Sequence, residues 1–342
     1  MITILATIFV FGLLVFVHEF GHFAVAKISG MKVTEFAIGF GPSLFKKQEG
    51  ETLYSIRIIP LGGYNKIAGM DPDDPEDPRN FDNQSVFKRL CVIVAGSFMN
   101  LILPVVIFFF IISFSGIQKP IDEPILGKIV DGRAAAIAGL KENDRILEVD
   151  GVKVTTWANL VDQIRVKPNQ QVALLLERDG KQLNIKVIPQ YDDKNERGII
   201  GVIAKSETLR PGLVETIKLS FMQTYLIATE MVKGIYQLIT GTQPADIAGP
   251  LGVAQMAGQV ASYGILPLLN FAALLSINLG LINLLPVPLL DGGHVVTLLI
   301  EGIRGKSLNP DVLYKVQMIG LVLLLSLFIF ATFKDLARFN IF

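Results

Sequence analysis

Apolar positions in this chain form long continuous runs. Three runs contain no Asp, Glu, Lys or Arg, at residues 90–118, 247–290 and 316–333, and a further apolar stretch begins at Ile2. A helix needs roughly 20 apolar residues to cross the hydrocarbon core of a bilayer. The pattern therefore predicts an α-helical integral membrane protein with about four spans. We place these spans at residues 2–26, 90–113, 268–290 and 316–333.

A β-hairpin is predicted between the first two spans. Residues 33–38 and 53–59 are rich in Val, Ile, Tyr and Phe, and a charged turn at 47–51 separates them. Such runs are typical of paired strands. We expect a small hairpin or sheet associated with the membrane.

Residues 211–241 have helical periodicity but also carry charge. An apolar stripe lies opposite a face with Glu215, Lys218, Glu230 and Lys233. This pattern favours a helix lying at the membrane interface over a fifth span. The uncharged segment 248–264, which is rich in Gly and Ala, leaves a re-entrant segment open.

Composition and charge narrow the range of functions. The 342 residues are 51% hydrophobic and 18% charged, with 31 basic and 31 acidic side chains. A net charge of zero gives no general basic surface, so nucleic acid is not an expected partner. The single cysteine, Cys91, cannot form an intramolecular disulfide or a thiolate cage. A metal would therefore need His and carboxylate ligands.

Basic residues predict the orientation in the membrane. Nine Lys or Arg residues lie at 27–89, between the first two spans, and none precedes the first span. By the positive-inside bias, this segment is cytoplasmic, while the N-terminus and residues near Asn340 lie outside. The first span lacks a basic start and a small-residue cleavage site, so we expect it to be retained. Segment 122–203 is then extracytoplasmic.

The chemistry is concentrated in His-Glu-Phe-Gly-His at residues 18–22. On a helix, His18 and His22 share a face and can bind one Zn²⁺, while Glu19 addresses the metal-bound water. A pair of structural core histidines is the alternative, but three ionisable groups beside a span are costly without function. Asp291, after two prolines that break the third span, is the expected third ligand. Both spans run inward, so the two motifs should meet at the cytoplasmic side.

These motifs resemble the site-2 protease family of intramembrane zinc metalloproteases, and in particular the bacterial branch that cleaves anti-sigma factors. The resemblance rests on residues 18–22 and on the Asn-x-x-Pro-x-Pro-x-Leu-Asp-Gly-Gly pattern at 283–293, and extends to 39–42, 60–64, 96–100 and 249–253. It implies that His18, His22 and Asp291 bind zinc, that Glu19 is the catalytic acid and base, and that Asn283 engages the substrate near the scissile bond. Relatives often have proline where this chain has Ser97, which puts the backbone geometry of the second span in question but not the chemistry.

The extracytoplasmic segment resembles a bacterial PDZ domain. The similar stretches are 125–130, 134–140 and 144–151, followed by alternating strands at 172–177 and 183–188. PDZ domains bind extended peptide ends by strand addition, which we place at Leu126 and Gly127. A folded spacer that excludes large proteins is an equally open alternative.

Four parts follow: 1–121 with two spans and the hairpin, 122–203 as the PDZ domain, 204–264 as the interfacial part, and 265–342 with the last two spans. The expected protein is a zinc metalloendopeptidase of the bacterial inner membrane, with its active site near the cytoplasmic side and lipid around it. Its expected substrates are single-span proteins of the anti-sigma type, already cut once by another protease, and also remnant signal peptides. The alternatives are a non-catalytic PDZ-containing peptide receptor with a structural zinc site and a metal-dependent transporter.

Overall fold

The computed structural model describes residues 1–71, 73–193, 195–242 and 248–338. The chain forms two compact units. We call Met1–Ile111 together with Leu213–Phe342 the membrane unit, and Ile112–Gly212 the inserted unit. Asn340 of the predicted topology lies outside the described residues.

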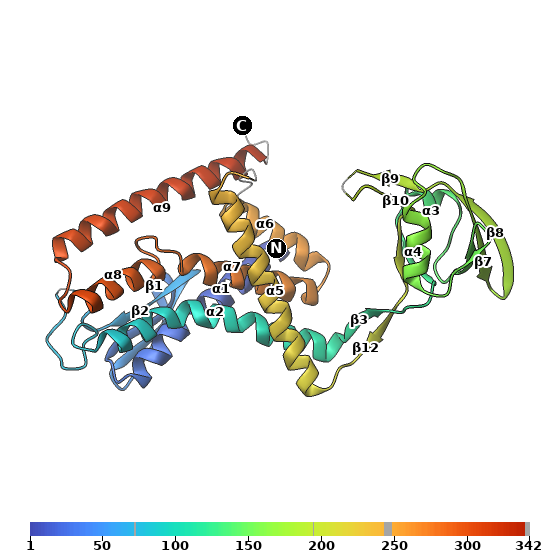
Figure 1. Cartoon of the computed structure of the whole chain (residues 1–342). Helices are drawn as coiled ribbons and strands as arrows, with labels where there is room; N and C mark the ends of the chain where they lie inside the picture. The colour runs from blue at the N-terminus through green and yellow to red at the C-terminus, as the bar shows by residue number, and fades with distance from the viewer. Residues whose placement is uncertain (72, 194, 243–247, 339–342) are drawn as a thin grey trace. The chain divides into compact units, whose positions relative to one another are not determined.

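Among the described residues, four helices are long and apolar enough to cross a bilayer, which confirms the predicted number. They are α1 (Ile2–Ile28), α2 (Val86–Ser115), α7 (Ile265–Asn283) and α9 (Pro310–Arg338) (Figure 1). Helices α1, α2 and α9 contain the whole predicted span and extend beyond it, because helix formation continues through flanking residues that the apolar run does not count.

The predicted end of the third span is wrong. Helix α7 stops at Asn283 rather than at residue 290. Pro286 and Pro288 lie in the turns that follow, since proline lacks the N–H that would continue a helix. A separate helix, α8 (Asp291–Arg304), then begins. Just before it, Leu289 has a φ of 75°, a strained conformation for a residue with a side chain.

Glycines allow the spans of the membrane unit to approach closely. Helices α1, α2, α6 (Pro250–Ser262) and α7 share one buried apolar cluster. A Cβ at Gly21 would lie 2.4 Å from the Ala95 carbonyl oxygen, and a Cβ at Gly280 would lie 2.9 Å from that of Ser97. Small residues at such positions are typical of helix contacts in membranes.

Segment 248–264, for which the sequence left a re-entrant segment undecided, contains helix α6. A side chain of α9 caps the N-terminus of α6. Asp335 is 1% exposed. Its carboxylate accepts hydrogen bonds from the Gly249 N–H at 3.0 Å and the Gly252 N–H at 2.8 Å. A negative charge at a helix N-terminus is favourable, so this contact attaches the end of α9 to the bundle.

Helix α5 (Leu213–Ile239) occupies the region predicted as an amphipathic helix. Its large apolar side chains at Val214, Phe221 and Val232 are exposed, whereas Thr216, Ser220 and Thr224 are buried. Small hydroxyl side chains suit a helix contact inside a membrane, and the exposed apolar stripe suits lipid. Among the described residues, α5 is not one of the four candidate spans.

The predicted hairpin is present and longer than expected. It consists of β1 (Val33–Glu49) and β2 (Thr52–Ile67), with Glu49 opposite Thr52 at the turn. Ile38 is registered with both Ile56 and Gly63, so the first part of β1 lies between two segments of β2. Residues 63–67 therefore form an outer segment of this sheet.

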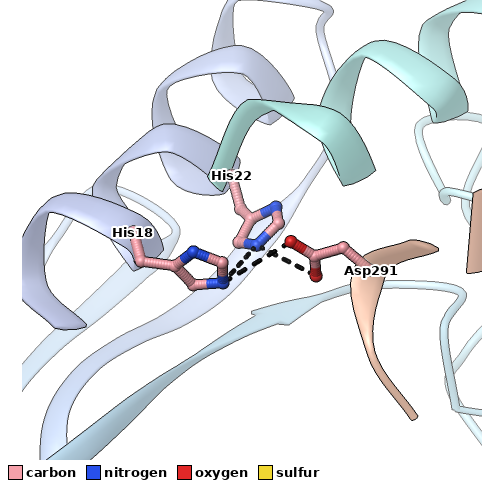
Figure 2. Close-up of side chains that lie close together, drawn as sticks. All are labelled: His18, His22 and Asp291. Atoms are coloured by element: carbon pink, nitrogen blue, oxygen red, sulfur yellow. Dashed lines mark hydrogen bonds and ion pairs between the residues drawn. The ribbon is translucent and has the colours of Figure 1, made fainter. Parts of the chain in front are cut away.

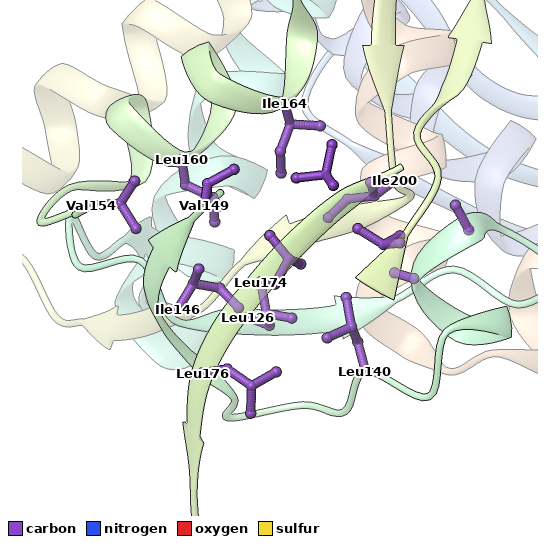
Figure 3. Close-up of a cluster of buried hydrophobic side chains, with 14 residues drawn as sticks. Leu126, Leu140, Ile146, Val149, Val154, Leu160, Ile164, Leu174, Leu176 and Ile200 are labelled. Carbon is purple, nitrogen blue, oxygen red and sulfur yellow. The ribbon is translucent and has the colours of Figure 1, made fainter. Parts of the chain in front are cut away.

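The inserted unit has the strands and helices expected of a PDZ domain. Its main sheet has the order β6-β5-β7-β8, and β4 pairs with β11 in a second sheet. Buried aliphatic side chains fill its core, as Figure 3 shows. The main elements are β4 (Leu126–Ile129), α3 (Ala134–Ile137), β5 (Arg145–Val149), β6 (Val152–Lys153), α4 (Trp157–Arg165), β7 (Val172–Arg178) and β8 (Lys181–Val187).

Shorter strands complete the inserted unit. Strand β3 (Ile117–Pro120) pairs with β12 (Ser206–Leu209) at the two ends of the insertion. The others are β9 (Gln190–Asp192), β10 (Arg197–Ile199) and β11 (Val202–Ala204). Because β3 and β12 pair, the chain enters and leaves this unit at neighbouring points.

Candidate metal centre

Two histidines on one helix face and one carboxylate from another helix converge in the membrane unit (Figure 2). His18 and His22 are one turn apart on α1, and Asp291 is the first residue of α8. The distances are 3.2 Å between the two Nε2 atoms, 3.6 Å from His18 Nε2 to Asp291 Oδ2, and 3.6 Å from His22 Nε2 to Asp291 Oδ1. The structure thus brings together three residues that the sequence singled out.

This donor set fits a zinc ion. Zinc bonds of about 2.0–2.1 Å in a tetrahedron place neighbouring ligand atoms roughly 3.3–3.4 Å apart. The 3.2–3.6 Å spacing of these nitrogen and oxygen atoms agrees with that geometry. Two imidazoles and one carboxylate also leave a fourth position for water, as catalytic zinc sites require.

A backbone hydrogen-bond partner fixes the orientation of the His22 ring. Its Nδ1 lies 2.8 Å from the Val92 carbonyl oxygen, which accepts only from a protonated nitrogen. The Nε2 lone pair of His22 is therefore free to face a metal. Gly96 makes room for this ring, because a Cβ there would lie 2.2 Å from His22 Nε2.

Asn100 lies against the outer nitrogen of His18. Its carboxamide Nδ2 is 3.2 Å from His18 Nδ1. A histidine that binds a metal through Nε2 carries its proton on Nδ1, so an acceptor is needed there. Asn100 Oδ1 is buried and has no partner among the described residues. Rotation of the amide by 180° places this oxygen against the ring nitrogen and satisfies both groups.

Ser97 orients the carboxylate. Its hydroxyl donates to Asp291 Oδ2 at 2.7 Å. The residue that departs from the proline common in relatives therefore contributes a contact here, and α2 continues as a helix through it. Gly292 allows Asp291 to sit against the preceding turn, because a Cβ on Gly292 would lie 2.2 Å from the Leu285 carbonyl oxygen.

Glu19 lies between the two histidines in the sequence and is held by the hairpin. Asn65 Nδ2 donates to both the backbone carbonyl oxygen and the carboxylate Oε2 of Glu19, each at 2.7 Å. Asn65 was not identified from the sequence, since a polar residue in a strand gives no signal that it faces a helix. Ser97 and Asn100 lay within a stretch already recognised as similar, but no role was predicted for either residue.

Asn283 lies before the turns that lead to Asp291, and His294 lies three residues after Asp291 in α8. Asn283 is the last residue of α7, and its predicted contact with substrate stays a prediction. His294 is not in the cluster of possible metal ligands found among the described residues. It lines an apolar cavity of about 290 Å³ between α8 and α9, and burial lowers the pKa of its ring.

The predicted peptide-binding edge at Leu126 and Gly127 does not fit the structure. Leu126 is fully buried, and both of its backbone groups are used, by Asp144 O at 2.8 Å and Asn143 N at 2.8 Å. A Cβ on Gly127 would lie 2.8 Å from the Ala204 carbonyl oxygen, because β4 is already paired with β11. Strand β4 therefore offers no free edge at these residues.

The inserted unit instead has an open groove between α4 and residues 197–202. Its volume is about 610 Å³, and its lining is mainly apolar. The lining residues are Trp157, Ala158, Leu160, Val161, Asp162, Ile164, Arg197, Gly198, Ile199, Ile200, Gly201 and Val202. An apolar groove beside a helix suits the end of an extended peptide.

Comparison with known proteins assigns most of the chain to one peptidase family. The model of peptidase family M50 matches residues 6–327. Zinc metalloprotease RasP of Geobacillus kaustophilus is 32% identical over 417 residues, covering 98% of this chain and 98% of the relative. Regulator of sigma-W protease RasP of Bacillus subtilis is 31% identical, again covering 98% of each chain. The match to the solved PDZ domain of an SdrC-like protein from Listeria monocytogenes covers 26% of this chain and 93% of that domain, with 22% identity and a TM-score of 0.22.

Proposed function

The chain belongs to peptidase family M50, and from this membership we propose that it cleaves membrane-spanning segments of bacterial membrane proteins at His18, Glu19, His22 and Asp291. It is a zinc metalloprotease with four candidate membrane spans. The observation that carries the proposal is the convergence of two ring nitrogens and a carboxylate beside Glu19, within a bundle of apolar helices.

The residues divide the work of hydrolysis. His18, His22 and Asp291 would hold a zinc ion, which would supply a Lewis acid beside Glu19. Glu19 takes a proton from the attacking water and delivers it to the leaving amine nitrogen. The C–N bond breaks as the carbon–oxygen bond forms, so one water is consumed for each peptide bond. Asn283 is proposed to engage the substrate near the scissile bond.

The substrate must be extended, because a helix hides its carbonyl groups in internal hydrogen bonds. The outer segment of β2, residues 63–67, offers a place for strand addition. A Cβ on Gly63 would lie 3.1 Å from Glu19 Cγ, so this segment runs directly beside the catalytic glutamate. A peptide added along it would have its carbonyl groups close to the metal ligands.

The proposed substrate class is the single-span membrane protein of the anti-sigma type. One relative is named a regulator of sigma-W protease, which supports this class. We propose that another protease removes part of the substrate first and that remnant signal peptides are a further class. We also propose that lipid covers the apolar faces that α9 and α5 expose.

The proposed location is the bacterial inner membrane, with the PDZ domain extracytoplasmic and the metal centre near the cytoplasmic side. The nine Lys and Arg residues at 27–89 support this orientation. The open groove of the inserted unit supports peptide capture as an accessory function of this domain. Exclusion of large proteins is the competing function. A non-catalytic receptor with a structural zinc site is the competing account of the whole chain. Glu19 argues against it, because a structural zinc needs no base.

Purified protein in detergent tests the proposal through zinc content and cleavage of a single-span anti-sigma substrate. Glu19→Gln should keep zinc and lose about 10²–10⁴-fold in rate, since an amide cannot accept the proton. Asp291→Ala should lose zinc as well, because it removes one of three protein ligands. Glu123→Gln, at an exposed ion pair with Arg145, is the matched control and should match the wild type. Near wild-type cleavage by Glu19→Gln contradicts the proposal.

A further inference from the structure

We propose that Asn65 is a positioning residue that fixes the carboxylate of Glu19 for proton transfer. The inference rests on the proposed function and extends it to a residue outside the motifs recognised in the sequence. Asn65 lies on β2 and Glu19 on α1, so the contact joins the hairpin to the catalytic helix.

The side-chain amide of Asn65 contacts both the backbone and the side chain of Glu19. Its Nδ2 lies 2.7 Å from the Glu19 backbone oxygen and 2.7 Å from Oε2 of the carboxylate. An amide nitrogen has two hydrogens, so both contacts can form at once. The backbone oxygen is fixed by the helix. The second contact therefore ties the carboxylate to a rigid point of its own residue.

The orientation of the Asn65 amide follows from its partners. Both Glu19 atoms are acceptors, and a rotated amide would place its own oxygen against them. Oδ1 of Asn65 is buried and has no partner among the described residues. The Asn65 side chain thus leaves its oxygen without a hydrogen bond while its nitrogen donates to Glu19. This arrangement is more typical of functional sites than of ordinary structural contacts.

Gly63, two residues before Asn65 on the same face of β2, leaves space for Glu19. A Cβ at Gly63 would lie 2.7 Å from the Ala37 carbonyl oxygen and 3.1 Å from Glu19 Cγ. Any side chain there would therefore push against Glu19. Positions 63 and 65 act together, one by leaving room and the other by holding the carboxylate.

Positioning of this kind acts on the chemical step. A displacement of a catalytic group by about 1 Å can cost about 10²-fold in rate. Glu19 without its partner can take other side-chain conformations, and only some of them face the attacking water. Loss of Asn65 should therefore lower kcat and leave the substrate affinity and the metal ligands unchanged.

The kinetic test uses Asn65→Leu, which keeps the size of the side chain and removes the donor. We expect kcat to fall about 10- to 100-fold, with KM within about threefold and zinc content unchanged. Asn184→Leu, the same substitution at an exposed position of β8 in the inserted unit, should match the wild type. A raised KM with unchanged kcat, or loss of zinc, overturns the proposal. If Asn65→Leu does not fold, Asn65→Ser has a hydroxyl too short to reach both Glu19 atoms and replaces it.

A second test does not depend on cleavage. Thermal unfolding midpoints of metal-free wild type, Asn65→Leu, Glu19→Ala and the double variant form a cycle. Contact between the two side chains predicts that the shifts are not additive. Additive shifts overturn the role of Asn65 and leave the proposed function intact. Absence of cleavage by the zinc-loaded wild type overturns the proposed function, so the two failures are distinguishable.

Discussion

Ser97 and Asp291 are 194 residues apart in the chain, and a hydrogen bond of 2.7 Å joins Ser97 Oγ to Asp291 Oδ2. The contact connects α2 to the first residue of α8. Residues around a metal ligand fix its direction and its basicity. The hydroxyl of Ser97 therefore helps to set how the Asp291 carboxylate faces the two histidines.

Replacement of Ser97 by alanine should weaken zinc binding. The carboxylate loses a donor that orients it, and loss of such a partner typically costs about 10- to 100-fold in metal affinity. Competition with a chelator measures this affinity directly. Ser326→Ala on α9 is the control, because that hydroxyl donates to the Val322 carbonyl oxygen of its own helix at 2.7 Å. Equal zinc affinity of the two variants would show that Ser97 does not orient the ligand.

Asn100→Leu should also weaken zinc binding, by about 10- to 100-fold, because His18 Nδ1 loses its contact with the Asn100 side chain. Asn100→Asp should bind zinc better than Asn100→Leu, since a carboxylate can accept from the same N–H. Isothermal titration of the metal-free variants with zinc measures both affinities.

Asn270→Leu provides the control for Asn100. Its side chain is exposed on α7 and donates to the Leu266 carbonyl oxygen at 3.0 Å, away from the histidines. Wild-type zinc affinity in Asn100→Leu, or an Asp variant weaker than the Leu variant, would contradict acceptance of the His18 proton by Asn100.

Removal of the PDZ domain should leave the metal centre intact. Pro120 is paired with Ser206, and the Ile121 N–H donates to Lys205 O at 2.9 Å, so a two-residue Asn-Gly turn can replace residues 122–204. Every proposed catalytic residue lies outside this segment. Zinc content should be unchanged, and cleavage should persist with a looser choice of substrate. Complete loss of cleavage in a folded, zinc-loaded deletion would make the domain part of the catalytic machinery.

Val161→Arg separates the two roles of the PDZ domain. Val161 lines the apolar groove, so an arginine there should weaken peptide capture. If the domain captures peptides, KM for the full substrate should rise while a substrate without its extracytoplasmic end is unaffected. If the domain only excludes large proteins, neither KM should change. Tryptophan fluorescence of Trp157, which lines the same groove, reports peptide binding independently.

The topology can be tested with single cysteines in a Cys91→Ser background. Replacements of Lys47 and Lys306 should resist a membrane-impermeant thiol reagent on intact cells, and a replacement of Asn195 should react. The nine Lys and Arg residues at 27–89 predict this result. Reaction of the cysteine at position 306 but not at 47 would place the two halves of the metal site on opposite faces. The proposed zinc centre could not survive that outcome.

Much of the membrane unit could be predicted because its signals are local. An uncharged run is visible without knowledge of its neighbours, and His18 and His22 share a face by helix geometry alone. The end of α7 was harder to predict from the sequence. No charged residue lies between Asn283 and Leu290, and only Pro286 and Pro288 mark the break.

Contacts between distant segments could not be predicted from local patterns. Asn65 meets Glu19 across 46 positions, and nothing in the composition of a strand shows which helix its polar side chain faces. The PDZ edge failed for a similar reason. Alternation identified strands, but not that β4 pairs with β11 and so loses its free edge at Leu126.

The close approach of α1, α2 and α7 at Gly21 and Gly280 has a consequence for bilayers of different thickness. Of the most apolar 18 residues, 11% are buried in α9, compared with 22% in α1, 39% in α7 and 50% in α2. A mismatch between helix length and hydrocarbon thickness is relieved by tilting, which costs least where few neighbours constrain a helix. Helix α9 should therefore tilt while the three helices around the histidines keep their spacing. Zinc affinity measured in short-chain and long-chain lipid bilayers should accordingly be the same.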